Sequence, residues 1–164
     1  MLPPWPGWDG LHPLIIHFPI ALLLVVPLFV VLAALRPGRS TAFGVSALVL
    51  LVLGTGAAFV AVETGEAAAE LAPRTEAIAA AIESHADLAE TARNVFAGLT
   101  LLYAVLLVLP VAVKKLATRS FVPVANAVFL VLVLGGDLVL ANAAHRGALL
   151  VHKFGVQAML PPGS

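Results

Sequence analysis

Residues 13–35 read PLIIHFPIALLLVVPLFVVLAAL, and His17 is the only side chain in this run that can ionise. A helix of that length rises about 35 Å, enough to cross the ~30 Å hydrocarbon layer of a bilayer. The run begins with proline, which suits the first turn of a helix, and it stops before Arg36-Pro37-Gly38-Arg39, where a helix breaker lies between two charges. The stretch therefore predicts a membrane span.

Three more runs of this kind follow, and together with the first they give predicted spans at 13–35, 41–62, 95–113 and 121–143. Lipid cannot pair with open backbone groups, so all four are expected to be helices. Hydrophobic residues make up 61% of the 164-residue chain and charged residues only 11%, far from the composition of a soluble domain. The sequence predicts an all-α membrane protein, a single four-transmembrane-helix bundle over residues 1–164 within the lipid bilayer.

Net charge and cysteine content exclude several classes of function. The formal net charge is zero, so no nucleic acid partner is indicated. The chain has no cysteine, which excludes disulfides, iron–sulfur clusters, thiolate zinc sites and covalently attached c-type haem. Any ligand held by side chains must use histidine, carboxylate or methionine.

Basic residues distinguish the two sides of the membrane. The short connections after spans one and three contain Arg36, Arg39, Lys114, Lys115 and Arg119, and no acidic residue. Such loops stay in the cytoplasm. Both termini and the segment between spans two and three are then expected outside, in the periplasm of a bacterium with this protein in its inner membrane. All five histidines fall on or near that outer side.

The polar segment at 66–93 is expected to be helical, because it is too rich in alanine and glutamate for a strand. Ile78, Ile82 and His85 recur at helical spacing on an apolar stripe, while the acidic residues share another face. His85 is therefore expected to point toward the bundle, on a helix that continues into the third span.

The fourth span is expected to extend beyond the membrane to about Gly155, because residues 142–152 contain no proline. Asp137, near the outer end of this span, could take part in proton movement or orient a ligand, but it is rather expected to reach the adjacent interface. No fixed-period repeat is visible in the sequence.

The histidines carry the strongest indication of chemistry, since an ionisable residue in or beside a membrane span is costly and usually functional. Facing imidazoles hold haem iron in helical bundles, and they also bind copper or zinc. His12 precedes Pro13 and faces about 140° away from His17, so only His17 of these two is taken as a ligand. The candidate ligands are His17, His85, His145 and His152.

Depth in the membrane suggests how the ligands pair. His17 and His145 lie near the outer boundary, whereas His85 and His152 lie about two turns beyond it. These pairs predict one or two b-type haems toward the periplasm. Beside the pairs, Arg93 and Arg146 are candidates to bind haem propionates, or else to pair with the surrounding glutamates. In span two, the small residues of Gly54-Thr55-Gly56-Ala57-Ala58 leave room either for a macrocycle or for close helix contact.

The sequence resembles the bacterial membrane proteins grouped as domain of unknown function 2231. The resemblance rests on His12-Pro13-Leu14-Ile15-Ile16-His17-Phe18-Pro19, on Thr64-Gly65, on His85 followed by Asn94, and on the closing stretch at 147–156. Many members have histidine where this chain has Phe154. The resemblance implies a four-span membrane domain that binds b-type haem and works with c-type cytochromes.

These observations favour a membrane electron carrier, or the haem-bearing subunit of a respiratory or photosynthetic complex, rather than an enzyme acting alone. The expected partner is a c-type cytochrome or a larger redox complex, and a quinone is left open. Two alternatives are a cofactor-free structural subunit of a redox complex and a membrane protein with a histidine-based copper or zinc site.

Overall fold

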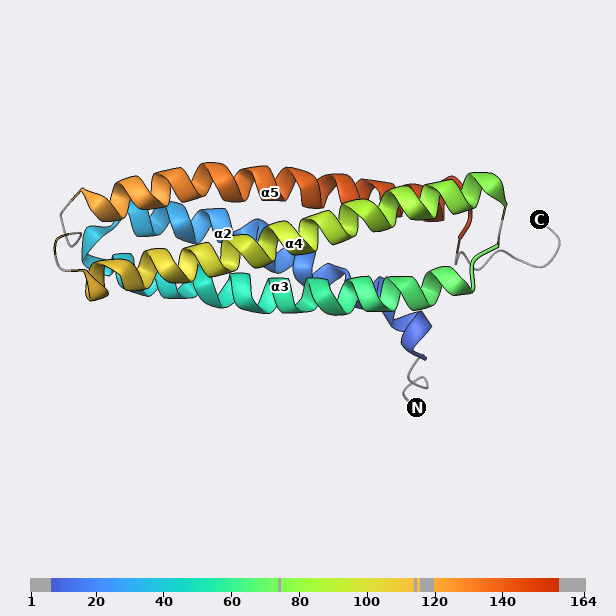
Figure 1. The fold of residues 1–164 in the computed structure, drawn as a ribbon, viewed down its shortest axis with the longest axis horizontal. Helices are drawn as coiled ribbons and strands as arrows, with labels where there is room; N and C mark the ends of the chain where they lie inside the picture. The colour runs from blue at the N-terminus through green and yellow to red at the C-terminus, as the bar shows by residue number, and fades with distance from the viewer. Residues whose placement is uncertain (1–6, 74, 114, 116–119, 157–164) are drawn as a thin grey trace.

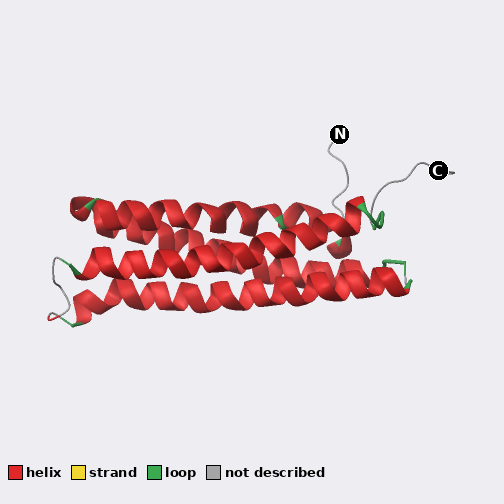
Figure 2. Ribbon diagram, turned by 90° about the horizontal axis from the view of Figure 1, so that it is seen from above, coloured by secondary structure: helices red, strands yellow, loops and turns green. Residues whose placement is uncertain are grey.

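The computed structural model describes residues 7–73, 75–113, 115 and 120–156, and within these ranges the secondary structure is entirely helical (Figures 1 and 2). Two short 3-10 helices precede or connect longer elements. In chain order the elements are η1 (Trp8–Leu11), α1 (His12–Ile15), α2 (His17–Leu35), η2 (Pro37–Arg39), α3 (Ser40–Glu70), α4 (Glu76–Ala112) and α5 (Phe121–His152).

The first span is formed by α1 and α2 together. Ile16, between them, keeps helical angles (φ −57°, ψ −25°), and its N–H still donates to the carbonyl oxygen of His12 at 3.1 Å. Pro19 removes one backbone donor in the next turn, which accounts for the local irregularity. The helix ends at Arg36, whose angles (φ −119°, ψ 74°) are not helical. The chain then turns through η2 into α3.

The four long helices form an antiparallel bundle in which each packs against two neighbours. The contacts link α2 with α3, α3 with α4, α4 with α5, and α5 with α2. The bundle is therefore a square of two helical hairpins, α2–α3 and α4–α5, with α2 and α4 at opposite corners. The described ends of α1 and α5 lie at the same end of the bundle as the α3–α4 connection (Figure 1).

All four helices are long and apolar enough to cross a membrane. Large apolar side chains on the outside of the bundle, such as Leu101 and Val131, are each 70% exposed in the isolated chain. In a soluble protein so much exposed apolar surface would drive aggregation, whereas here it contacts lipid. The prediction of an all-α, four-span membrane protein is confirmed.

The helices α3, α4 and α5 are longer than a ~30 Å hydrocarbon layer requires. The segment expected to be helical at 66–93 is divided between the end of α3 and the start of α4, with a break around Pro73. Thr75 caps α4 by accepting a hydrogen bond from the N–H of Ile78 at 3.3 Å. From Glu76 the helix runs unbroken into the third span, and α5 extends to His152, both as expected.

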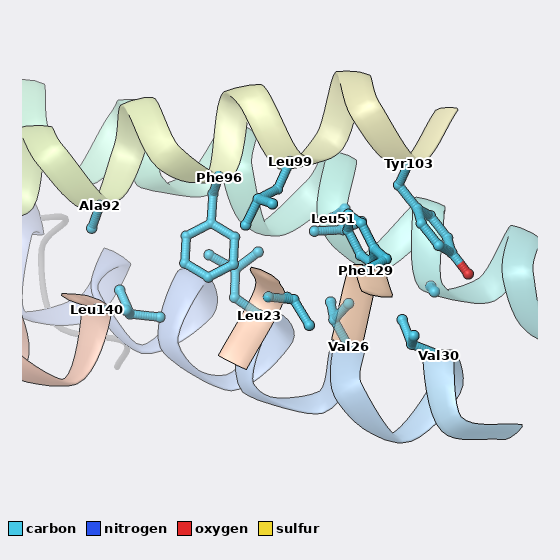
Figure 3. Packing of buried hydrophobic residues seen from close by; sticks show 12 residues of the cluster. Leu23, Val26, Val30, Leu51, Ala92, Phe96, Leu99, Tyr103, Phe129 and Leu140 are labelled. Carbon is cyan, nitrogen blue, oxygen red and sulfur yellow. The ribbon is translucent and has the colours of Figure 1, made fainter. Parts of the chain in front are cut away.

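The core runs along the axis of the bundle (Figure 3). Its fully buried members include Leu23, Leu51, Phe96 and Phe129, one from each long helix. Close approach of helices depends on Gly54, where a Cβ atom would lie 2.7 Å from Cγ of Leu23. The small residues of span two were expected either to leave room for a macrocycle or to allow close helix contact. For Gly54, the structure shows close helix contact.

A buried hydrogen bond joins α4 to α5 at the far end of this core. The Tyr103 hydroxyl donates to Oδ1 of Asn126 at 2.8 Å, and Asn126 donates in turn to the carbonyl oxygen of Val122. Tyr103→Phe leaves the Asn126 oxygen without a donor, so we expect a loss of about 1 kcal/mol in unfolding free energy. Unfolding in mixed micelles, followed by circular dichroism, measures it. Ser46→Ala, which removes an exposed hydrogen bond within a helix, should change stability by much less.

Candidate histidine site

His12 lies at the start of α1, and its ring reaches across to α3. Its Nδ1 donates to the carbonyl oxygen of Ala61 at 2.9 Å, and the hydroxyl oxygen of Thr64 is 3.3 Å from the same nitrogen. Thr64 is fully buried and donates its own proton to the carbonyl oxygens of Val60 and Ala61. The imidazole is thus fixed against the last turns of α3.

His85 is held in the same way by the other hairpin. It lies in the third turn of α4, and its Nδ1 donates to the carbonyl oxygen of Ala143 on α5 at 3.0 Å. The ring is half-buried. The expectation that His85 points into the bundle is confirmed.

The two rings meet between the hairpins. Their centres are 6.4 Å apart, and the ring planes make an angle of 74°. Since α2 and α4 occupy opposite corners of the bundle, His12 and His85 approach each other across its interior.

The hydrogen bonds determine which nitrogen carries the proton. A carbonyl oxygen can only accept, so Nδ1 of each ring is the protonated nitrogen. In the neutral imidazole, Nε2 then keeps its lone pair. A backbone carbonyl on one nitrogen is the usual support for a histidine whose other nitrogen binds a metal. Both histidines therefore have the same hydrogen-bonded arrangement, with Nε2 left without a proton.

The interior near these rings is lined by small side chains. Buried residues of α3 from Ala58 to Ala68 are alanine, valine and threonine, and Ala143 continues the pattern on α5. Farther along the axis the core contains large side chains such as Phe96 and Phe129, and Figure 3 shows the change from Ala92 to Phe96 along α4. In Figure 1, α3 and α4 also diverge toward their connection. The small side chains of α3 therefore leave little bulk beside the two rings.

The other predicted ligands lie elsewhere. His17, His145 and His152 are all exposed, and His12 with His85 is the only pair of histidine rings in contact in the part of the chain that the structure describes. The structure therefore does not bring His17 to His145, or His152 to His85. Five residues separate His17 from His12, so it projects from another side of the helix.

The two arginines differ in their surroundings. Arg93 lies over the ring of Phe59 at 5.2 Å, and it is 3.9 Å from a carboxylate oxygen of Glu90. It therefore connects α4 to α3. Arg146 is exposed and adjoins Gly147, beside a surface hollow that also contains Glu83 and Asp87. Arg146 lies on the same turn of α5 as Ala143, whose carbonyl oxygen accepts the hydrogen bond from His85.

Asp137 was expected to reach the membrane interface, but the structure places it inside the bundle. It is only 8% exposed, and its Oδ1 has no hydrogen-bond partner within the described residues. The short side chain and its inward direction keep the carboxyl group inside the bundle.

His12 was not among the ligands predicted from the sequence, because the first span was predicted to begin at Pro13 and His17 was expected to be the ligand. The helix in fact starts at His12, with Pro13 in its first turn, where proline is well tolerated. Helix geometry shows that His12 and His17 face different ways, but it does not show which of the two points inward.

Comparison with known proteins identifies the family. No curated protein and no solved structure matches the chain. A family model described as "Predicted membrane protein (DUF2231)" matches residues 9–159, a range that includes His12, His85 and the helix turns that hold them. This match confirms the resemblance seen in the sequence, and the chain belongs to this family of membrane proteins.

Proposed function

We propose that the protein is a membrane b-type cytochrome that binds one haem b between His12 and His85. Bound haem would supply one-electron chemistry through its iron. The observation that carries the proposal is the pair of imidazoles facing each other from opposite corners of the bundle, each with Nδ1 bonded to a backbone carbonyl.

The spacing of the rings suits a single metal ion. Imidazole nitrogens bind metals at about 2 Å, so two rings on opposite sides of one ion have centres about 6 Å apart. The centres of His12 and His85 are 6.4 Å apart. Hydrogen bonds to the carbonyl oxygens of Ala61 and Ala143 hold the two rings near this distance.

Two protein ligands are enough for haem iron, whose other four ligands come from the macrocycle. A zinc or copper site formed by side chains alone needs three or four. Within the described ranges, no three histidine or acidic residues lie close enough together to hold an ion. The pair thus supports haem rather than a bare metal ion, and Arg146 is the cation best placed to bind a propionate.

The site lies toward one side of the membrane. Arg36 and Arg39 lie at the opposite end of the bundle, and Lys114 and Arg119 in the second basic loop fall outside the described residues. Basic loops face the cytoplasm, so the histidines lie on the periplasmic side of the inner membrane. Electron exchange there would be with a c-type cytochrome or the rest of a redox complex, since the described helices form no large domain outside the membrane; a quinone is a further candidate.

The test is a spectrum of the protein purified in detergent from haem-replete cells. A reduced-minus-oxidised spectrum should show the sharp bands of a six-coordinate b-type haem, and a pyridine haemochrome assay should give about one haem per chain. Metal analysis separates the alternatives: stoichiometric copper or zinc without iron would identify a bare metal site. Protein with neither iron nor another metal, and unable to take up added haemin, would be a structural subunit.

A further inference from the structure

The two hairpins repeat one pattern of buried residues. All four buried residues of α4 lie 73 positions after buried residues of α2, the same offset as from His12 to His85. All eight buried residues of α5 lie 82 positions after buried residues of α3, the same offset as from Gly65 to Gly147. The pairs in the first set are Pro19 and Ala92, Leu23 and Phe96, Val26 and Leu99, and Val30 and Tyr103.

Close contacts within the hairpins repeat as well. A Cβ atom on Gly54 would lie 2.7 Å from Leu23, and one on the equivalent Gly136 would lie 3.2 Å from Phe96, the equivalent of Leu23. The hairpins are therefore related by an approximate two-fold axis. Since His12 and His85 are also equivalent, the axis passes between their rings.

A glycine lies against each of these rings. A Cβ atom on Gly65 would be 2.9 Å from Cε1 of His12, and one on Gly147 would be 2.9 Å from Cε1 of His85. Each glycine follows by four residues the carbonyl that accepts the Nδ1 proton. Because a Cα–Cβ bond in a helix tilts toward the N-terminus, a side chain at either position would cover that carbonyl.

We propose that Gly65 and Gly147 are the positioning residues of two equivalent half-sites. Each one exposes a helix carbonyl that takes the Nδ1 proton of a histidine, and thereby keeps Nε2 of that ring unprotonated and free to bind. Real Cβ atoms do not approach ring atoms to 2.9 Å, so an alanine displaces the ring and weakens its bond to the carbonyl. The expected loss of haem affinity rests on the proposed function. The expected displacement of the histidine ring does not depend on that function.

The first experiment uses the protein without haem. Nitrogen chemical shifts of ¹⁵N-labelled histidine report which ring nitrogen carries the proton. Both His12 and His85 should be in the Nδ1–H form in the wild type. Gly65→Ala should shift His12 toward a mixture of the two forms and leave His85 unchanged, and Gly147→Ala should do the reverse. Unchanged shifts in both variants would overturn the proposal, whether or not the protein binds haem.

The second experiment titrates detergent-solubilised apoprotein with haemin. Loss of a group that supports a metal ligand typically lowers affinity about 10-fold to 100-fold, and the equivalence of the half-sites predicts similar losses for Gly65→Ala and Gly147→Ala. The two glycines lie on different helices, so either variant tests the proposal if the other does not fold. Wild-type affinity in a folded variant would contradict it, and absence of binding by the wild type would instead reject the proposed function.

Matched controls come from the same helices. Gly56 on α3 and Gly135 on α5 have no heavy atom within 4 Å of an added Cβ. Gly56→Ala and Gly135→Ala should keep the wild-type tautomers and haemin affinity. Gly54→Ala, which forces Leu23 to move, should lower stability without changing the tautomer of His12. If it changed that tautomer as much as Gly65→Ala, general disturbance of α3 would explain both results and the positioning role would be rejected.

Discussion

Replacing His12 with alanine is expected to abolish the b-type spectrum of the purified protein, and His85→Ala should do the same. Each substitution removes one of the two proposed histidine ligands, so a six-coordinate haem cannot form. Because the two histidines occupy equivalent places in the two hairpins, the losses should be similar in size. Pyridine haemochrome content and the reduced-minus-oxidised spectrum measure the effect, and circular dichroism verifies that the helices remain.

The three exposed histidines provide the controls for this prediction. His17→Ala, His145→Ala and His152→Ala should keep the haem, since none of these rings contacts the His12–His85 pair. Added imidazole should restore part of the six-coordinate spectrum to His12→Ala, because a free imidazole can occupy the space of the lost ring. Loss of haem in His17→Ala with retention in His12→Ala would instead support the pairing expected from depth alone.

The sequence was sufficient to predict the architecture of this protein. The spans follow from apolar runs of the length that a bilayer requires, and they end where arginine, proline and glycine interrupt them, as at Arg36-Pro37-Gly38-Arg39. The inward direction of His85 was also predictable, because the acidic residues of that segment mark the opposite face of the helix.

The inward direction of His12 was not predictable by the same reasoning. Its helix is apolar on every side, so residues that face lipid cannot be told from residues that face the bundle by hydrophobicity. The structure shows that the buried stripe of this helix runs through Pro19, Leu23, Val26 and Val30. Extended back by seven residues from Pro19, the stripe reaches His12 and misses His17.

The repeat of the two hairpins escaped detection for a related reason. The offset is 73 residues between the first helices and 82 between the second, so the α4–α5 hairpin is longer by nine residues and no single period relates the halves. Equivalent residues also differ in kind, as with Leu23 and Phe96. The hairpins share the positions of their buried residues and of the glycines beside the histidines. These positions can be recognised only from the packing in the structure.

Phe96→Ala is expected to have the largest effect on stability, lowering the free energy of unfolding by about 3 kcal/mol. Phe96 is completely buried, and its ring packs against Gly136, where even a Cβ atom would be only 3.2 Å away. Gly136 has no side chain that could extend into the space left by the ring. Association of helices in lipid depends on such packing rather than on exclusion of water, so the cavity costs the contacts outright. Unfolding in mixed micelles, followed by circular dichroism, measures the change.

Phe18→Ala is the matched control, because Phe18 is 54% exposed on the lipid-facing surface and its loss should cost less than about 0.5 kcal/mol. Phe96 lies eleven residues beyond His85, or about 16 Å along the helix. Folded Phe96→Ala protein should therefore keep its b-type spectrum, while His85→Ala, which removes one hydrogen bond between α4 and α5, should lose much less stability than Phe96→Ala. Equal stability of Phe96→Ala and Phe18→Ala would mean that the interior is not packed as described. If Phe96→Ala and His85→Ala each lost both the b-type spectrum and the stability, the two ends of α4 would not be independent. Haem binding and folding would then form one cooperative unit.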